Sequence, residues 1–99
     1  MLKATAATTI LVYLAMPTLA LADEHDAVSL FKERGCANCH DVKTWKMGPP
    51  LKSVATKYRG NRAAGEQRIT AALTNGVGHP KTNASEEEVK AMVNWILSL

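Results

Sequence analysis

Apolar residues recur at helical spacing in the second half of the chain, where they repeat every three or four positions. The clearest stripe lies near the C-terminus and follows one helix face over two full turns. Its members are Val89, Met92, Val93, Ile96 and Leu97. Ser85 and Glu88 form the sequence signature of a capping box just before this stripe. We therefore expect a helix whose N-cap is Ser85.

Three further short helices are predicted before this one. The first runs from a cap at Asp26 to a stop at Gly35, the second begins after Pro50, and the third ends at Asn75-Gly76. Their apolar positions are, in turn, Val28, Leu30 and Phe31; Leu51, Val54, Ala55 and Tyr58; and Ile69, Ala72 and Leu73. No segment alternates convincingly as a strand does, so the sequence predicts an all-α domain. Segments 39–50 and 76–84 lack a pattern, which in so small a domain indicates loops that wrap around something.

The first 22 residues have the three-part pattern of a secretory signal peptide. Lys3 supplies the basic start, residues 4–21 carry no charge, and Ala20-Leu21-Ala22 is a small-x-small cleavage site. We expect residues 1–22 to be removed and residues 23–99 to form one exported domain. An uncleaved membrane anchor is the alternative, since the uncharged stretch approaches the shortest possible span. Pro17 and the cleavage site favour removal. In either case the rest of the chain is expected to be exported, which in a Gram-negative bacterium means the periplasm.

Size and charge exclude several classes of protein. The chain has 12 Lys and Arg against 9 Asp and Glu, a formal charge of +3 that falls to +2 when Lys3 leaves with the leader. Such a charge does not indicate nucleic-acid binding. The length excludes a multidomain enzyme, and two cysteines exclude a disulfide-dense scaffold. Because an apolar core of this size stabilises by only about 3–5 kcal/mol, we expect a further staple such as a cofactor.

The motif that carries chemistry is Cys36-Ala37-Asn38-Cys39-His40, the C-x-x-C-H attachment signature of c-type haem. Two intervening residues in a tight turn let each thiol reach one vinyl group of the same porphyrin. His40 then lies beneath the iron as its first axial ligand. Three other interpretations of the motif fit less well. A thioredoxin-type redox pair would need a βαβ setting, which this chain lacks. A zinc site would crowd the adjacent residues Cys39 and His40, and a disulfide would close a strained ring. Covalent haem c is the interpretation that we favour.

Beyond this motif, the chain resembles small bacterial class I cytochromes c over nearly all of residues 26–99. The segments that carry the likeness are Leu30-Phe31-Lys32 with Gly35-Cys36, Gly48-Pro49, Val54-Ala55 with Lys57-Tyr58, Asn75-Gly76, and Trp95-Ile96-Leu97-Ser98. The resemblance implies the cytochrome c fold, in which four short helices surround one covalently attached haem. It also implies that the Pro49 carbonyl accepts the other ring N–H of His40. Phe31 and Trp95 are expected to meet where the first and last helices cross.

The sequence departs from that family at the second axial ligand, which is usually a methionine in the loop before the last helix. No methionine lies between Met47 and Met92. Counted back from Ser85, the ligand position in the resembling proteins falls on His79, so we predict that His40 and His79 both bind the iron. The alternatives are Met47, Met92 as a ligand instead of a core residue, or an open site near Asn75 or Asn83. His25 is expected to be exposed to solvent.

These features predict a one-electron carrier in the periplasm, without enzymatic activity and monomeric. A second imidazole in place of a thioether predicts a lower reduction potential than that of Met-ligated relatives. The alternatives are a haem-based sensor or gas-binding protein with a labile distal site, and the cytochrome subunit of a periplasmic oxidoreductase. Basic side chains around the haem edge would steer acidic redox partners, or would form an ordinary solvated surface. They are Lys43, Lys46, Lys52, Lys57, Arg59, Arg62 and Lys81. Trp45 either covers the haem edge or packs against the second helix.

Overall fold

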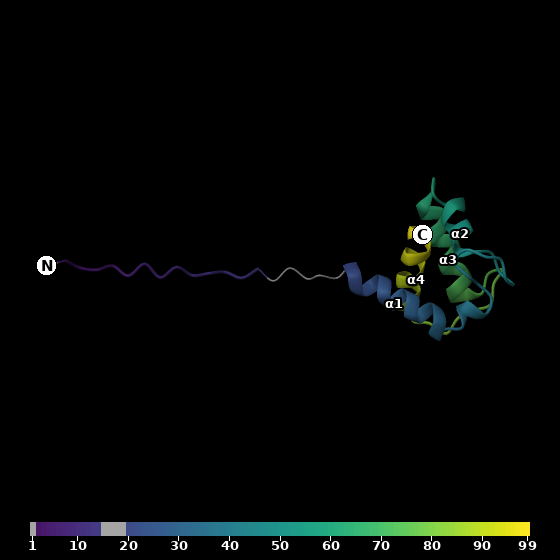
Figure 1. Ribbon diagram of the computed structural model, residues 1–99, viewed down its shortest axis with the longest axis horizontal. Helices are drawn as coiled ribbons and strands as arrows, with labels where there is room; N and C mark the ends of the chain where they lie inside the picture. The colour runs from purple at the N-terminus through teal and green to yellow at the C-terminus, as the bar shows by residue number, and fades with distance from the viewer. Residues whose placement is uncertain (1, 15–19) are drawn as a thin grey trace.

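The four predicted helices are present in the computed structural model, which describes residues 2–14 and 20–99. Within these ranges no residue is in a β-strand, and the helical elements all fall in residues 20–99. They are α1 (Ala20–Glu33), the short 3-10 helix η1 (Cys36–Asn38), α2 (Leu51–Lys57), α3 (Arg62–Asn75) and α4 (Glu86–Ser98) (Figure 1). The all-α prediction is confirmed. No helix in the described part of the chain has the length and apolar character needed to cross a membrane.

Helix α1 begins upstream of the predicted start. Asp26 lies inside α1, so the prediction that it caps this helix is wrong. Alanine and leucine are strong helix formers, and residues 20–22 therefore extend the helix when the leader is still attached. The backbone of α1 consequently passes through the predicted cleavage site after Ala22. The predictions for Pro17 and for the side chain of His25 lie outside the described residues.

The other helix ends agree with the sequence signals. Gly35 and Gly76 follow α1 and α3 with φ angles of 77° and 68°, in the left-handed region where glycine carries no Cβ penalty. At the start of α4 the Ser85 side chain accepts a hydrogen bond from the Glu88 N–H, while the Glu88 side chain accepts one from the Ser85 N–H. Arg34 then donates to both carboxylate oxygens of Glu88, at 3.0 and 2.8 Å. This ion pair joins the end of α1 to the start of α4.

Helix α4 forms the centre of the core and packs against α1, α2 and α3. Its predicted stripe is largely buried, and Met92 is only 2% exposed. Trp95 meets Phe31 of α1 edge to face, with ring centroids 5.5 Å apart, as the resemblance implied. The interpretation of Met92 as a core residue is therefore confirmed, and α1 and α4 provide a fixed support for the loops.

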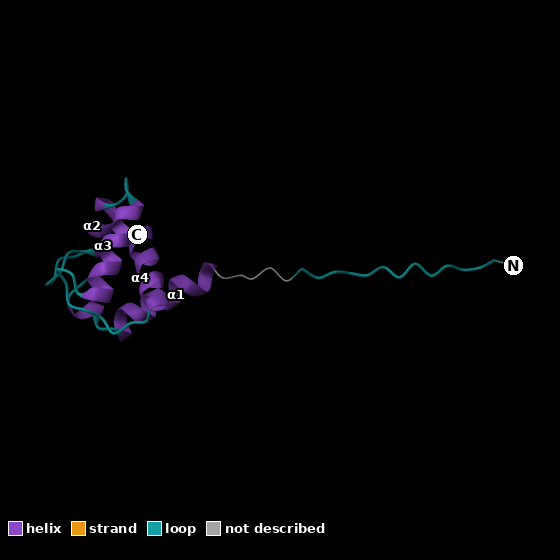
Figure 2. Cartoon of the chain, turned by 180° about the vertical axis from the view of Figure 1, so that it is seen from behind, coloured by secondary structure: helices purple, strands orange, loops and turns teal. Residues whose placement is uncertain are grey.

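Two long loops complete the domain. The His40 loop (residues 39–50) joins η1 to α2, and the His79 loop (residues 76–85) joins α3 to α4. Both lie on the same side of the helices in Figure 1 and in the reverse view of Figure 2. These are the two segments in which the sequence shows no apolar pattern, and they carry the residues with candidate chemistry.

Candidate functional site

The Cys-x-x-Cys-His segment folds as a single tight turn at the end of α1. The carbonyl oxygen of Cys36 accepts hydrogen bonds from the N–H groups of Cys39, at 3.1 Å, and His40, at 2.9 Å. Both cysteines are free and half-buried. The turn therefore presents two thiols and one imidazole from five consecutive residues, as the sequence predicts.

The surroundings of Cys36 are apolar. Its side chain contacts both hydrophobic clusters of the core, one around Phe31 and Trp95 and the other around Met92 and Val93. Burial raises the pKa of the Cys36 thiol, and the nearby Cys39 thiol raises it further. A redox-active pair needs a lowered thiol pKa, so this environment argues against a thioredoxin-like function.

The imidazole of His40 is held from two directions by its own loop. Its Nδ1–H donates to the Pro49 carbonyl oxygen at 2.8 Å, which is the contact that the resemblance implied. The backbone of Gly48 lies directly against the ring, and a Cβ added at Gly48 would stand 2.3 Å from His40 Cε1. The Gly48-Pro49 pair is visible in the sequence, but the steric role of Gly48 becomes clear only in the structure.

His79 faces His40 across the two loops. The ring centroids are 5.9 Å apart and the ring planes lie within 14° of parallel. Two imidazoles that bind one metal ion from opposite sides, with bonds of about 2.0–2.1 Å, have centroids roughly 6 Å apart. Nδ1 of His79 is 2.7 Å from the carbonyl oxygen of Pro80, so it too carries the ring proton. The separation and the nitrogen donors both fit a haem iron between the rings.

The side chains considered as alternative ligands lie elsewhere. Met92 is in the core, and Met47 is 87% exposed, with its Sδ 3.8 Å from Cys39 Sγ in the His40 loop. Trp45 is 72% exposed, which excludes the prediction that it packs against α2. In the described residues no group of three or more His, Cys, Asp or Glu side chains is arranged to hold a metal ion.

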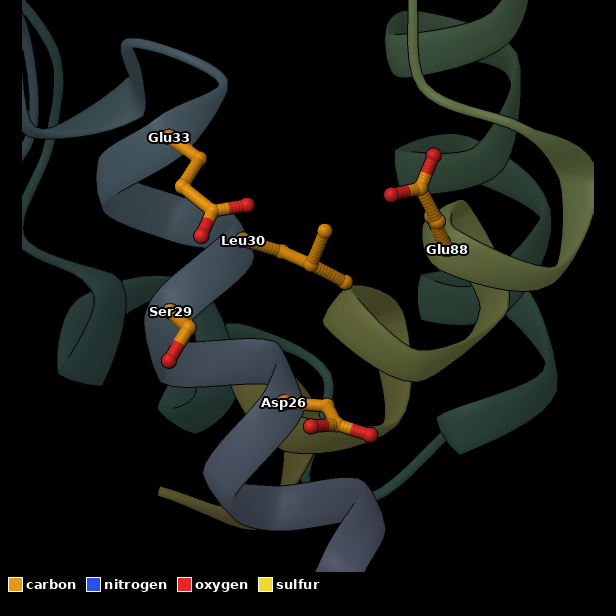
Figure 3. Close-up of a pocket in the computed structure, with 5 residues that line it drawn as sticks. All are labelled: Asp26, Ser29, Leu30, Glu33 and Glu88. Atoms are coloured by element: carbon orange, nitrogen blue, oxygen red, sulfur yellow. The ribbon is translucent and has the colours of Figure 1, made fainter.

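A separate pocket of about 270 Å³ lies between α1 and the start of α4. It is lined by Asp26, Ser29, Leu30, Glu33 and Glu88, as Figure 3 shows. None of these residues is a histidine or cysteine. The pocket is thus distinct from the site formed by the two loops.

The predicted basic side chains are all exposed, but they do not form one ring. Arg59 donates to the carbonyl oxygen of Leu99, and Arg62 donates to Glu66 and to Asn94 of α4. These two arginines are therefore directed toward the C-terminal helix and do not belong to the loops. Lys43 and Lys46 are in the His40 loop, and Lys81 is in the His79 loop.

Comparison with known sequences gives a consistent result. The family model described as cytochrome c matches residues 25–99. Cytochrome c-551 of Allochromatium vinosum is 37% identical over 87 residues, which cover 81% of this chain and 88% of that protein. Cytochrome c-552 of Hydrogenobacter thermophilus is 36% identical over 76 residues, 71% of this chain and 78% of that protein.

Comparison with solved structures agrees. The class 1 cytochrome MtoD from Sideroxydans lithotrophicus has a TM-score of 0.64 and 37% identity, and the match covers 75% of this chain and 92% of that one. A deletion mutant of cytochrome c552 from Nitrosomonas europaea has a TM-score of 0.63 and 29% identity, over 72% of this chain and 96% of that one. The four helices and the two loops thus have the arrangement of these proteins.

Proposed function

This chain belongs to the cytochrome c family, and we propose that it is a periplasmic one-electron carrier in which His40 and His79 both bind the haem iron. Members of the family carry one covalently attached haem c, and its relatives are small monohaem electron carriers and not enzymes. When bound, the haem supplies the Fe(III)/Fe(II) couple. The chain's own side chains would attach the haem, bind its iron and exclude water from it.

Attachment is assigned to Cys36 and Cys39. With haem bound, each S–H would add across one of its vinyl groups, the sulfur to one carbon and the proton to the neighbouring carbon, with no leaving group. The neutral, half-buried Cys36 lies between two apolar clusters, which supports its role at a large apolar ring. Treatment with acidic acetone tests this assignment, because covalently attached haem stays with the denatured protein. Release of the pigment would contradict it.

The observation that carries the ligand assignment is the shared orientation of the two imidazoles. In each ring Nδ1 faces a proline carbonyl oxygen, that of Pro49 for His40 and that of Pro80 for His79. A carbonyl oxygen can only accept a hydrogen bond, so the Nδ1 that faces it carries the proton and the lone pair of the ring lies on Nε2. Together with the 5.9 Å separation of the rings, this leaves both imidazoles ready to ligate one ion. Such fixing of the tautomer by an outer hydrogen bond is general among metal-bound histidines.

Ligation by two histidines predicts a low-spin ferric haem with a reduction potential below that of His/Met relatives. Low-temperature EPR of the ferric protein distinguishes two imidazoles from one imidazole and a thioether, and a potentiometric titration gives the potential. His79→Met should raise the potential, because a thioether favours the ferrous state. Met47→Leu is the matched control and should leave both measurements unchanged. A wild-type potential within the range of His/Met cytochromes would contradict the proposal for His79.

Carbon monoxide separates the carrier from a gas-binding sensor. If His79 holds the sixth position of the iron, carbon monoxide should change the spectrum of the reduced wild-type protein only slowly. The His79→Ala variant should react with carbon monoxide rapidly. A rapid reaction of the wild-type protein would instead favour the sensor.

The location and the processing of the leader belong to the same proposal. Residues 1–22 are proposed to direct export and to be cleaved after Ala22, which releases residues 23–99 as a soluble monomer in the periplasm. The mass of the protein purified from the periplasmic fraction tests this directly. A mass that includes residues 1–22 would indicate a retained anchor, and co-purification of a stoichiometric partner would indicate a subunit of an oxidoreductase.

A further inference from the structure

The carboxylate of Asp41, the residue after His40, binds the backbone of its own loop. One of its oxygens, Oδ2, accepts hydrogen bonds from the Lys43 N–H at 2.8 Å, the Thr44 N–H at 2.9 Å and the Thr44 hydroxyl at 3.1 Å. An aspartate side chain that accepts the N–H two residues on forms an Asx turn. Asp41 therefore turns the chain back directly after the histidine, in a segment that has neither helix nor strand.

This turn belongs to the same closed loop that holds the imidazole. The Gly48 N–H donates to the Cys39 carbonyl oxygen at 2.8 Å, which joins the returning part of the loop to its start. The next residue is Pro49, whose carbonyl oxygen accepts the Nδ1–H of His40 at 2.8 Å. The backbone carbonyl oxygen of Asp41 accepts the N–H of the first residue of α2 at 3.0 Å. Asp41 thus contributes its side chain to the turn and its backbone to the closure.

The closure of this loop has a cost that the Asp41 side chain reduces. Residues 42–47 must give up the other conformations open to an irregular segment. Three hydrogen bonds to one oxygen offset part of that entropy. The Pro49 carbonyl is then in place for His40, and an outer hydrogen bond of this kind sets both the orientation and the basicity of a metal-bound imidazole.

We propose that Asp41 is a positioning residue for His40, because its carboxylate oxygen fixes the turn that keeps the Pro49 carbonyl on Nδ1. The inference rests on the proposed function, since it concerns one of the two proposed iron ligands. It assigns the role to the acceptor oxygen and not to the negative charge. Loss of the turn should let the His40 ring rotate and weaken its Nδ1–H bond. A less basic imidazole then raises the reduction potential.

Because all three hydrogen bonds reach one oxygen, acceptor and charge can be separated by substitution. Asp41→Asn keeps a side-chain oxygen at the same distance from the backbone but removes the charge, so it should behave as the wild type. Asp41→Glu keeps the charge but moves its oxygens away by one methylene group, and Asp41→Ala removes the acceptor. These two variants should share one defect. Glu87→Ala, which removes an exposed carboxylate of α4, is the control.

Two measurements on the holoprotein report the position of His40. The rings of His40 and His79 lie within 14° of parallel. The rhombicity of a low-spin ferric EPR spectrum depends on the angle between two axial imidazole planes. Asp41→Ala and Asp41→Glu should therefore shift or broaden this spectrum and raise the potential in a potentiometric titration. Asp41→Asn and Glu87→Ala should do neither.

Amide hydrogen exchange in the ferrous protein reports the turn without using the iron as a probe. In Asp41→Ala the Gly48 N–H should exchange about 10-fold faster, the factor expected when hydrogen bonds that favour the closed loop are lost. The Val89 N–H, which donates to the Ser85 carbonyl oxygen in α4, should exchange at the wild-type rate. Equal acceleration of both amides would indicate a general loss of stability and would overturn the positioning role.

The variants also define the other results that would overturn the proposal. One is an unchanged spectrum, potential and Gly48 exchange rate in Asp41→Ala or, if that variant does not fold, in Asp41→Glu. Another is a defect in Asp41→Asn that Asp41→Glu does not share, because charge would then be the cause. A wild-type protein without covalent haem would instead refute the proposed function. A wild-type EPR spectrum without two imidazoles would refute the assignment of His79, and exchange at Gly48 would still decide the role of Asp41.

Discussion

The two histidines of the site are held in different ways. His40 is fixed by residues distant along its loop, since Pro49 accepts its Nδ1–H and Gly48 lies against its ring. The His40 loop is in turn joined to the start of α2, where Leu51 N–H donates to the Asp41 carbonyl oxygen at 3.0 Å. His79 instead hydrogen-bonds to Pro80, the next residue in its own loop. Its position therefore follows the loop as a whole.

The His79 loop is attached mainly near its ends. Thr82 N–H donates to the Leu73 carbonyl oxygen at 3.0 Å, and the loop then enters the capping box of Ser85 and Glu88. Between these points and Gly76, residues 77–81 carry His79, the proposed second ligand. The difference teaches that the His40 side of the site is preformed and that the His79 side is adjustable.

The largest effect is expected where the preformed side is disturbed. Gly48→Ala places a Cβ 2.3 Å from His40 Cε1, so the ring or the loop must move. Overpacking of this kind costs about 1–3 kcal/mol of unfolding free energy. The ferric EPR spectrum should also become heterogeneous, because His40 no longer has a single orientation. Gly60→Ala is the matched control, since nothing lies within 4 Å of its added Cβ. Equal stability of the two variants by urea unfolding would contradict the steric role of Gly48.

A smaller effect is expected at the end of the adjustable loop. Ser85→Ala removes the side chain that accepts the Glu88 N–H at 3.2 Å, and loss of an N-cap costs about 1 kcal/mol. Because the loop ends at this cap, the variant should also increase the rate at which carbon monoxide displaces His79. Ser53→Ala, on the exposed face of α2, serves as the control and should change neither property. A loss of stability without a faster reaction would show that the cap does not restrain His79.

The hydroxyl of Thr82 should contribute less. Its Oγ1 accepts the Ala84 N–H at 2.8 Å in a half-buried position, and a neutral hydrogen bond of this type contributes about 0.5–1.5 kcal/mol. Thr82→Val keeps the shape and removes the acceptor, so unfolding free energy should fall by an amount near the lower end of that range. Thr56→Val is the comparison, because the Thr56 hydroxyl donates to Lys52 on an exposed helix face. If both variants lose the same stability, the hydroxyl of Thr82 has no special role in the loop.

Much of this molecule follows from the sequence, because its signals are local. The capping box, the two left-handed glycines and the apolar stripe of α4 each depend on residues within one or two turns. The turn that presents Cys36, Cys39 and His40 is local as well. The prediction for His79 depends on the likeness to a family, since no local pattern distinguishes a ligand from a surface histidine.

What the sequence could not supply are contacts between distant residues. Gly48 against His40 and the ion pair of Arg34 with Glu88 depend on how the loop and helices meet. Trp45 is exposed in a loop in which the Asp41 carboxylate accepts the Lys43 N–H, and no hydrophobic pattern encodes that hydrogen bond. Helix α1 begins before the start that the sequence predicts, because helix propensity across residues 20–22 outweighs the capping signal at Asp26.

The smallest effect is expected from acid, at the ion pair that ends the His79 loop. Arg34 and the Ser85 N–H lower the pKa of the Glu88 carboxyl by hydrogen bonding. Because the pKa is lower in the folded state than the value of about 4.3 in unfolded chains, this stabilisation is present above that pH. It is lost as the pH falls through the lowered folded-state pKa. Both side chains are partly exposed, so solvent weakens the pair.

Glu88→Gln should therefore be less stable than the wild type at pH 7, and the difference should shrink toward pH 3, as the wild-type carboxyl takes up its proton. Urea unfolding at the two pH values measures both quantities. Glu87→Gln removes a neighbouring carboxylate from the same helical turn and should show no such convergence. If the gap between Glu88→Gln and the wild type is as large at pH 3 as at pH 7, the ionised pair contributes nothing and the neutral part of the capping box alone anchors the adjustable loop. In that case the His40 side and the His79 side of the site differ only in their hydrogen bonds. Added salt should then not change the rate at which carbon monoxide displaces His79.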